Sequence, residues 1–273
     1  MPAFTAKDVK ALRERTSMGM MECKKAMTEA DGDVDKAIAL LREWAGGKMD
    51  DRGDREASEG AIALAETSGA AVLVQLTSET DFAAKNDDFI AAAQKIADLA
   101  IGLSATGDVT EHATDEMKAL VEDLRITIKE NISLKGIHRL EAEKFGTYVH
   151  GNRKSAAMVG VSGEAEEDLL KGLAMHVTAA VPPVTPAPLA VDKTGLPEDE
   201  VAKAQQGFVA EAEATGKPKE IAEKIAMGKL NKWVDEQTLM GQTYIRELDA
   251  KKPVRDYLPK GTTITGFVRA AVG

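Results

Sequence analysis

The sequence predicts an α+β protein with three short N-terminal helices, two units that each combine an antiparallel sheet with a helix, and an inserted antiparallel helical hairpin. Three observations favour this fold class. Residues 1–45 show the apolar spacing of short helices, and a pattern of two strands followed by a helix occurs twice, starting near residues 60 and 145. Two further helical stripes, joined by Gly216-Lys217-Pro218, follow the second of these helices.

The first unit, residues 1–46, is predicted to contain three helices around a very small core. Thr5 followed by Asp8 is typical of a helix cap, and Asp33 after Gly32 is expected to cap the third helix. The apolar faces of the second and third helices are predicted to consist of Cys23, Ala26, Met27, Ala30, Val34, Ala37, Ile38 and Leu41.

A linker and the first sheet-and-helix unit follow. Residues 47–58 are polar and contain glycine, which predicts a linker, and residues 59–141 are predicted to form the first part of the core. Two apolar runs separated by Thr67-Ser68-Gly69 predict a β-hairpin, and a later helix is expected around Met117–Ile128. The helix directly after the hairpin is predicted to bury Phe89, Ile90, Ala93, Ile96, Ala97 and Ala100.

The second part of the core is predicted from two stretches, residues 142–182 and 232–273. In the first stretch, "KFGTYVH" and "SAAMVGVSG" flank a turn at "GNRK" and predict another hairpin. In the second stretch, "TLMGQTYIREL" and "TITGFVRAAVG" are predicted to be strands that complete this sheet. The helix after the hairpin is predicted to carry Leu169, Leu173, Val177 and Ala180 on one face.

Residues 183–231 are predicted to be an inserted helical hairpin that begins with an extended proline-rich segment. Its two helical stripes are predicted to contain Val201, Gln205, Phe208 and Ala212, and Ile221, Ala222, Ile225 and Met227. The pattern is compatible with a hairpin that pairs two chains in a homodimer, packs on a partner or remains free.

Composition limits the class of protein. The 273 residues carry a formal net charge of −10, and because phosphate binding needs a basic surface, we expect no binding of nucleic acid. Cys23 is the only cysteine, which excludes an intramolecular disulfide and fits a reducing compartment. No stretch reaches the roughly 20 apolar residues of a membrane span, and the N-terminal region lacks an apolar run of signal-peptide length. We therefore expect a cytoplasmic protein without membrane contact.

The sequence contains no pattern that predicts a catalytic or metal site. It has no Gly-rich phosphate loop and no nucleophile elbow, so we expect no enzyme activity, no cofactor and no direct nucleotide binding. The four histidines are isolated from one another: His112, His138, His150 and His176. Cys23 is either a reactive thiolate beside Lys24 and Lys25 or a small core residue, and its place on an apolar face favours the core.

The stretch from Lys7 to Lys25 is the one clearly basic segment of this acidic chain. A run of this kind is usually the solvated face of a helix. Met20 and Met21 are expected in a loop beside it, and flexible apolar side chains flanked by positive charge are also suited to docking on an acidic or amphipathic partner. The residues alone leave both interpretations open.

The segment "SETDFAAKNDDF" gives two hypotheses for Phe82. In the first, Thr80 or Asp81 caps a helix and Phe82 packs inward on the same face as Phe89. In the second, the ring is exposed and is received by a partner. The residues alone favour the first hypothesis, but a second helix start at Asn86 would leave Phe82 in a loop, so periodicity does not decide between them.

Four segments in order along nearly the whole chain share one resemblance: "LRERTSMGMMECKKAMTEADGDVDKAIALLREWAG", "SETDFAAKNDDF", "YVHG" and "TGKPKEIAEKIAMGKLNKW". Together they resemble the bacterial translation elongation factor Ts family. The resemblance implies a guanine nucleotide exchange factor for elongation factor Tu, with a ubiquitin-associated-like helical domain and a two-part α+β core that carries a helical hairpin. Exchange of this kind requires binding and no bond chemistry, in keeping with the lack of a catalytic pattern.

The resemblance also implies roles for individual residues. Thr80, Asp81 and Phe82 match the family's wedge, which enters the G domain of elongation factor Tu near its Mg²⁺ and phosphate site. His150 matches a histidine of the second hairpin that faces the partner, which is contacted through its G domain and a second domain. The family positions that grip the G domain match Arg13, Met20, Met21 and Lys24.

Some segments depart from the family pattern. Ser78 stands where the family often has cysteine, and the segment after His150 matches poorly, so we expect an offset in strand register there. "QTYIRELDAKKPVRDYL" also differs, and the sequence stops at "FVRAAVG" without the extra C-terminal helix that some members lay on the G domain, which bears on affinity. The alternative function is a non-exchanging binding or chaperone module for a translation factor, which would not need the wedge.

Overall fold

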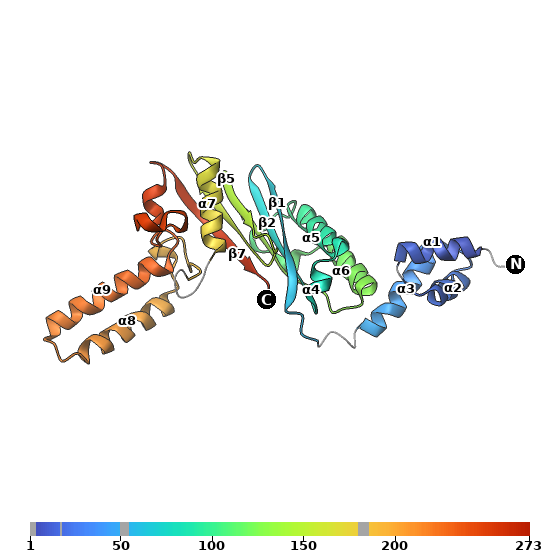
Figure 1. Cartoon of the computed structure of the whole chain (residues 1–273), viewed down its shortest axis with the longest axis horizontal. Coiled ribbons are helices and arrows are strands. Elements are labelled where there is room, and N and C mark those ends of the chain that lie inside the picture. Colours follow the sequence, from blue (N-terminus) through green and yellow to red (C-terminus); the bar gives the residue numbers. More distant parts are fainter. Residues whose placement is uncertain (1–3, 17, 50–54, 180–185) are drawn as a thin grey trace.

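The computed structural model describes residues 4–16, 18–49, 55–179 and 186–273, and the side chains of residues 45–49 are left out of this description. A central α+β core lies between an N-terminal helical unit at one end and a projecting helical hairpin at the other (Figure 1). Residues 50–54 of the predicted linker lie outside the described residues, as do Ala180 and the beginning of the proline-rich segment.

The N-terminal unit consists of α1 (Ala6–Thr16), α2 (Met20–Glu29) and α3 (Val34–Met49). The predicted first cap is confirmed, because the Thr5 N–H donates to Asp8 Oδ2 at 2.7 Å and the Asp8 N–H donates to Thr5 Oγ1 at 3.4 Å. The three helices enclose a small core that contains Val9, Leu12, Met18, Cys23, Ala26, Met27, Ala37 and Leu41.

Two predictions for this unit are wrong. Met20 and Met21 are not in a loop: they are the first residues of α2, because extended Gly19 precedes them and its N–H donates to Glu22 Oε2 at 3.1 Å, as in a capping box. Val34 is exposed, since it begins α3 and the buried stripe starts one turn later, at Ala37.

The first sheet has the strand order β1-β2-β4-β3, and all its pairs are antiparallel. The predicted hairpin is confirmed as β1 (Glu59–Thr67) and β2 (Ala70–Ser78), which are joined by a turn in which Gly69 adopts a φ of 114°. The sequence reasoning missed β4 (Ser133–Glu141) and the short β3 (Gly107–Asp108), although β4 pairs with β2 along most of its length.

Helices α5 (Asp87–Ala100) and α6 (Asp115–Ile128) cover the outer face of the first sheet, and the 3₁₀ helix η2 (Thr110–His112) precedes α6. Both α-helices were predicted. Their core with the sheet contains Val72, Val74, Leu76, Phe89, Ala93, Ile96, Ala97, Met117, Leu124 and Ile137.

The second sheet has the order β5-β6-β7, with β5 (Lys144–Val149), β6 (Ser155–Ser162) and β7 (Thr263–Ala271) paired antiparallel. The predicted hairpin and the strand "TITGFVRAAVG" are therefore confirmed. Helix α7 (Glu167–Thr178) covers the outer face of this sheet and buries Leu173 and Val177. Pairing of β6 with β5 is continuous after the turn, and a register shift occurs only against β7, between Gly160 and Val161.

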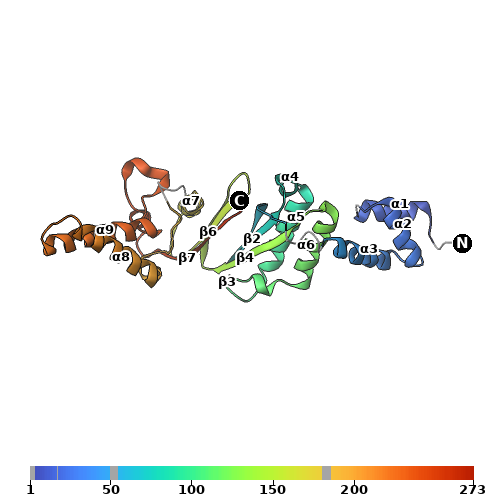
Figure 2. The same ribbon diagram turned by 90° about the horizontal axis from the view of Figure 1, so that it is seen from below.

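The two sheets pack against each other between the helices, which gives a helix–sheet–sheet–helix core (Figure 2). Successive strand residues point to opposite faces. Ile62 and Leu73 of the first sheet therefore meet Phe145 and Met158 of the second, while the alternate residues of each strand face the helices.

The helical hairpin consists of α8 (Glu198–Glu213) and α9 (Lys219–Gln237), and a short 3₁₀ helix, η3 (Lys193–Gly195), precedes it. Two helices can bury only a narrow seam, which here contains Ala212, Ala222 and Ala226 with Phe208 and Ile225 packed on it. The wider stripe that was predicted is wrong at three positions, since Gln205, Ile221 and Met227 are exposed. None of the described helices is long and apolar enough to span a membrane.

The segment "TLMGQTYIREL" was predicted to be a strand, and this prediction is wrong. It forms isolated bridges and then the 3₁₀ helix η4 (Ile245–Ala250), which is followed by η5 (Val254–Tyr257). After α9 the buried Gln242 side chain holds the chain, because its amide donates to the carbonyls of Pro186 and Glu236 at 2.8 Å each.

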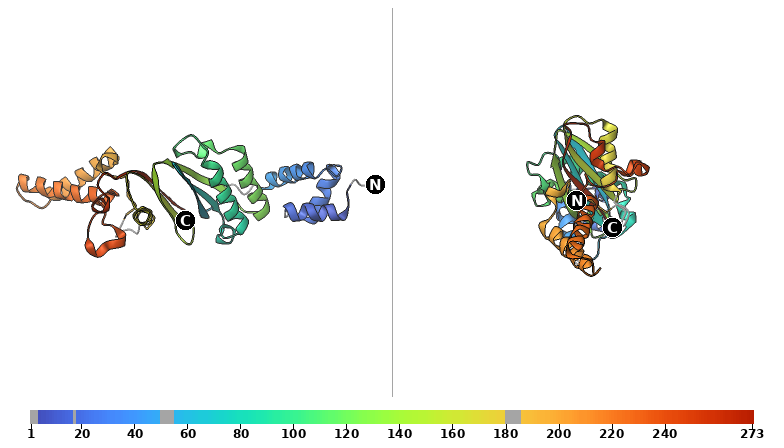
Figure 3. Two further views of the ribbon diagram at one scale, coloured as in Figure 1. Left: turned by 90° about the horizontal axis from the view of Figure 1, so that it is seen from above. Right: turned by 90° about the vertical axis from the view of Figure 1, so that its left-hand side faces the viewer.

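The N-terminal unit contacts the core through α6. Ile126 of α6 belongs to the apolar cluster of the N-terminal helices, and Arg42 of α3 pairs with Asp123 of α6 at 2.8 Å. Figure 3 shows the resulting elongated arrangement from above and end-on.

Candidate partner-binding site

The predicted wedge begins a helix of a single turn, α4 (Asp81–Ala84), directly after β2. Thr80 is its N-cap, with extended backbone and with Oγ1 accepting a hydrogen bond from the Ala83 N–H at 3.2 Å. Ala83 and Ala84 are buried and attach the helix to the core. The capping part of the first hypothesis for Phe82 is therefore confirmed.

The packing part of that hypothesis is wrong, because Phe82 is 83% exposed whereas Phe89 is fully buried. The two rings do not share a helix face, since Asn86 caps a separate helix, α5, by accepting the Asp88 N–H at 2.8 Å. Burying a phenylalanine side chain is worth about 1.5–3 kcal/mol. Because the Phe82 ring is exposed in the isolated protein, this stabilisation is available when a partner molecule buries the ring.

Carboxylates hold the backbone before α4. Glu130, which follows α6, accepts hydrogen bonds from the Thr80 N–H at 3.0 Å and from the Thr80 hydroxyl at 2.6 Å. Glu79 accepts the Asn131 N–H at 2.7 Å and pairs with Arg55 at 3.2 Å. Sequence reasoning missed Glu130, because it lies 50 residues from Thr80 and no local pattern connects them.

Four charged groups surround the base of α4. Lys85 donates to Asp81 Oδ2 at 2.6 Å, and this hydrogen bond is the main reason that the pKa of Asp81 lies below, and the pKa of Lys85 above, the usual value. Lys154 is close enough to lower the pKa of Asp81 further, and it forms an ion pair with Glu59 at the start of β1. The turn after β5 therefore lies beside α4.

His150 is exposed at the beginning of that turn. Its backbone N–H donates to the Ser155 carbonyl at 2.9 Å, its carbonyl accepts the Arg153 N–H at 2.7 Å, and its Nδ1 lies 3.0 Å from Asn152 Oδ1. The Arg153 carbonyl accepts the Ile62 N–H at 2.8 Å, which attaches the turn to β1. The imidazole is thus presented on a rigid backbone.

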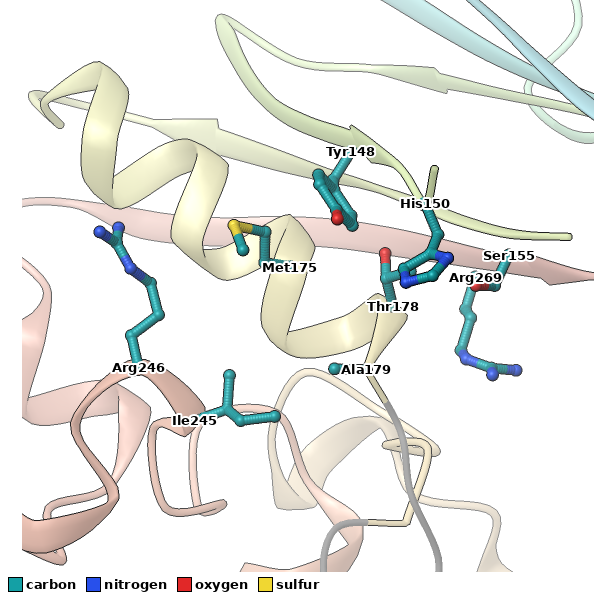
Figure 4. Close-up of a pocket in the computed structure, with 9 residues that line it drawn as sticks. All are labelled: Tyr148, His150, Ser155, Met175, Thr178, Ala179, Ile245, Arg246 and Arg269. Carbon is teal, nitrogen blue, oxygen red and sulfur yellow. The ribbon is translucent and has the colours of Figure 1, made fainter. Parts of the chain in front are cut away.

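A cavity of about 510 Å³ lies next to His150, and Figure 4 shows its lining. Tyr148 lies edge-on to the imidazole, with ring centroids 6.4 Å apart. The other lining residues come from β6, β7, α7 and η4: Ser155, Arg269, Met175, Thr178, Ala179, Ile245 and Arg246.

The structure does not bring the N-terminal candidates next to α4. Arg13 lies near the end of α1, and Met20, Met21 and Lys24 lie on α2, in the separate unit at one end of the molecule (Figure 1). All four side chains are exposed. Within the described part of the chain, Arg13 and Lys24 form no ion pair, so their charges are available to a partner.

Cys23 is fully buried in the N-terminal core. A buried thiol cannot reach a substrate, so the hypothesis of a reactive Cys23 is wrong. Among residues 4–16, 18–49, 55–179 and 186–273, no three His, Cys, Asp or Glu side chains are grouped so as to hold a metal ion. The arrangement offers an exposed ring, a presented imidazole and unpaired cations, which are groups for contact with a macromolecule.

Comparison with known proteins relates the chain to one family. The sequence profile described as "Elongation factor TS" matches residues 79–273. The chain is 39% identical over 279 residues to "Elongation factor Ts" of Photobacterium profundum, covering 100% of this chain and 93% of that protein. It is 39% identical over 282 residues to "Elongation factor Ts" of Methylococcus capsulatus, covering 99% and 92%, and 38% identical over 280 residues to that of Francisella tularensis subsp. novicida, covering 100% and 93%.

Proposed function

The chain belongs to the elongation factor Ts family, and from this premise we propose that it is a guanine nucleotide exchange factor that binds elongation factor Tu·GDP and promotes GDP release. The observation that supports the proposal most directly is the exposed ring of Phe82 on a capped and anchored helix. The same premise supports a ubiquitin-associated type for the N-terminal helices. We also propose the division into residues 1–46, 47–58, 59–141, 142–182 with 232–273, and 183–231, with α3 and α9 continuing past residues 46 and 231 to Met49 and Gln237.

Exchange in this proposal is a matter of linked binding equilibria. A factor that binds nucleotide-free elongation factor Tu more tightly than the GDP complex lowers the affinity for GDP by the same ratio by which GDP lowers the affinity for the factor. Insertion of the Phe82 ring between elements of the G domain supplies about 2–3 kcal/mol of apolar burial. That free energy is available to displace the groups that hold Mg²⁺ and phosphate.

The remaining site residues have separate roles. Asp81, kept ionised by Lys85, supplies a carboxylate beside the ring, and Thr80 fixes the first turn of α4. Arg13 and Lys24, with Met20 and Met21, hold the G domain from the N-terminal unit. His150, on the turn beside α4, faces the partner.

A Phe82→Ala variant tests the role of the ring. We expect the maximal rate of GDP release to fall roughly 30- to 140-fold, which corresponds to about 2–3 kcal/mol at 1.4 kcal/mol per tenfold. The concentration of factor that gives half the maximal rate should change little, because the other contacts remain. Stopped-flow release of labelled GDP from elongation factor Tu measures both quantities.

Leu248→Ala provides the matched control, because Leu248 is also an exposed apolar side chain but lies in η4. This variant should release GDP at the wild-type rate. An unchanged maximal rate for Phe82→Ala would refute the wedge. If the wild-type protein bound elongation factor Tu without accelerating release, the chain would be a non-exchanging binding module.

A further inference from the structure

One carboxylate satisfies two donors of the residue that caps α4. Glu130 Oε2 accepts the Thr80 N–H at 3.0 Å, and Glu130 Oε1 accepts the Thr80 hydroxyl proton at 2.6 Å. The same hydroxyl oxygen accepts the Ala83 N–H at 3.2 Å. The hydroxyl therefore donates its proton to Glu130 while its oxygen caps the helix. Because the proton is held by Glu130, the lone pairs of the Thr80 oxygen are oriented towards the Ala83 N–H.

The contact between these two segments is reciprocal. The Glu79 carboxylate accepts the backbone N–H of Asn131 at 2.7 Å, just as the Glu130 carboxylate accepts the backbone N–H of Thr80. The side-chain amide of Asn131 in turn donates to the Arg55 backbone carbonyl at 2.7 Å. One carboxylate from each segment thus holds the backbone of the other.

Glu130 is itself placed by the end of α6. Lys129 is the C-cap of α6 and adopts a left-handed conformation with a φ of 64°, after which the chain leaves the helix at Glu130. A left-handed residue at this position reverses the chain direction sharply. Since α6 is anchored through buried Met117 and Leu124, the carboxylate is presented from a rigid element.

Helix α4 needs this external support. A helix of four residues has no stability of its own, because helix nucleation is unfavourable. Phe82 is exposed and adds no packing to the body of the protein, so the direction of its ring depends on the first turn and on the buried alanines.

We propose that Glu130 is a positioning residue for the ring of Phe82: by holding both donors of Thr80 it fixes the first turn of α4 in the orientation that a partner receives. The inference rests on the proposed function for its consequence in exchange. Its structural part, the dependence of α4 on Glu130, stands independently of that function.

Glu130→Gln tests the structural part. A glutamine has one acceptor oxygen, and its NH₂ group would donate to the Thr80 hydroxyl oxygen, so it competes with the Ala83 N–H for that oxygen and weakens the cap. Hydrogen–deuterium exchange of the Ala83 amide should then become roughly five- to tenfold faster, as expected for a weakened helix cap. Glu122→Gln is the control, because the Glu122 carboxylate lies within α6 and pairs with Arg125, and it should leave this amide unchanged.

The same variants test the consequence for exchange. Glu130→Gln should lower the maximal rate of GDP release about three- to tenfold, again the size of a lost cap, without changing the concentration of factor at half the maximal rate. In a double-mutant cycle with Thr80→Val, the two effects should be strongly non-additive, since both variants remove one shared contact. If Glu130 only stabilised the fold, Glu130→Gln would lower the melting temperature, but it would not lower the maximal rate of GDP release at an unchanged half-maximal concentration of factor.

Wild-type exchange of the Ala83 amide in Glu130→Gln would overturn the proposal, and so would additive effects in the cycle. The two proposals fail in distinguishable ways. If the wild-type protein did not accelerate GDP release, the proposed function would fall while faster Ala83 exchange would still support the role of Glu130 in holding α4.

Discussion

Within α4, Ala83 and Ala84 pack into the core while Phe82, directly before them, faces water. Successive helix positions are rotated by about 100°, so one turn is enough to bury two small side chains and expose a large one. Because the ring is not needed for packing, it is free to be selected for contact with a partner. The residues that hold this surface in place are therefore distinct from those that present a group to a partner.

Arg13 and Lys24 belong to the presenting group, and reversal of both charges tests this assignment. Arg13→Glu combined with Lys24→Glu should slow association with elongation factor Tu roughly tenfold at low ionic strength, with a smaller effect at high salt, because salt screens exposed charges. Association rates measured at several salt concentrations provide the test.

The control for this pair is Lys95→Glu combined with Lys118→Glu, which changes the net charge equally at exposed positions of the core helices α5 and α6. Its association should remain close to that of the wild type. Equal slowing by both pairs would mean that net charge alone acts, and no slowing by the Arg13 pair would remove the N-terminal unit as a binding surface.

At the element scale, close contact between α7 and β5 depends on a glycine. A Cβ on Gly146 would lie 1.8 Å from the Leu170 carbonyl oxygen, so Gly146→Ala forces the helix away from the strand. We expect a loss of about 1–3 kcal/mol in the free energy of unfolding, as for other overpacked sites. Gly228→Ala in exposed α9 meets no atom within 4 Å and should be neutral or slightly stabilising. Denaturant unfolding of both variants checks this, and equal stabilities would contradict it.

His176 connects α7 to the segment after α9. Its Nδ1 accepts the Ile245 N–H at 3.2 Å, so the imidazole is neutral and Nε2 donates to Gln242 Oε1 at 2.9 Å. Burial lowers the pKa of His176 below its usual value of 6.5, whereas the unfolded chain titrates near that value. Below pH 6.5 the unfolded state therefore binds more protons, and stability falls as the pH decreases towards the folded-state pKa.

We expect His176 to lower the free energy of unfolding by up to about 1.4 kcal/mol for each pH unit that the pH falls between 6.5 and the folded-state pKa. Unfolding of the wild type and of His176→Gln between about pH 7.5 and pH 5.5, the range in which an ordinary histidine titrates, measures the slope. His112→Gln, at an exposed position, should keep the wild-type slope. If His176→Gln also kept it, the pH dependence would have another origin.

The elements with regular patterns were predictable, and β4 shows why others were not. Its apolar residues Leu134, Ile137 and Leu140 are spaced by three, which does not resemble the alternation of a strand. The irregular spacing accompanies a register shift of β4 against β2, between Gln75 and Leu76. A bulge of this kind is specified by the neighbouring strand, so the sequence of β4 alone does not reveal it.

The candidate site shows the same limit. A cap at Thr80 and a helix start at Asn86 could be predicted, because their hydrogen bonds are local. The exposure of Phe82 was left undecided by periodicity, and the contact with Glu130 joins segments that are distant in sequence. Only the folded chain brings these groups together.

On the scale of the whole molecule, the core lies between two helical projections, the N-terminal unit and the hairpin of α8 and α9 (Figure 3). The turn that carries His150 lies beside α4, while the N-terminal unit is joined to the C-terminal part of α6 by Ile126 and the Arg42–Asp123 pair. An elongated protein of this kind can contact a large partner at several separated points, and no single pocket has to provide the affinity. This arrangement suits a factor that changes the conformation of another protein.

The most direct test of this account is GDP release measured with far fewer moles of this protein than of elongation factor Tu·GDP, in the presence of excess unlabelled nucleotide. We predict that all of the labelled GDP is released in a single phase, with a rate constant proportional to the amount of factor, since the factor must dissociate and act repeatedly. Release of only as much GDP as the factor added, or release at the spontaneous rate, would contradict the account.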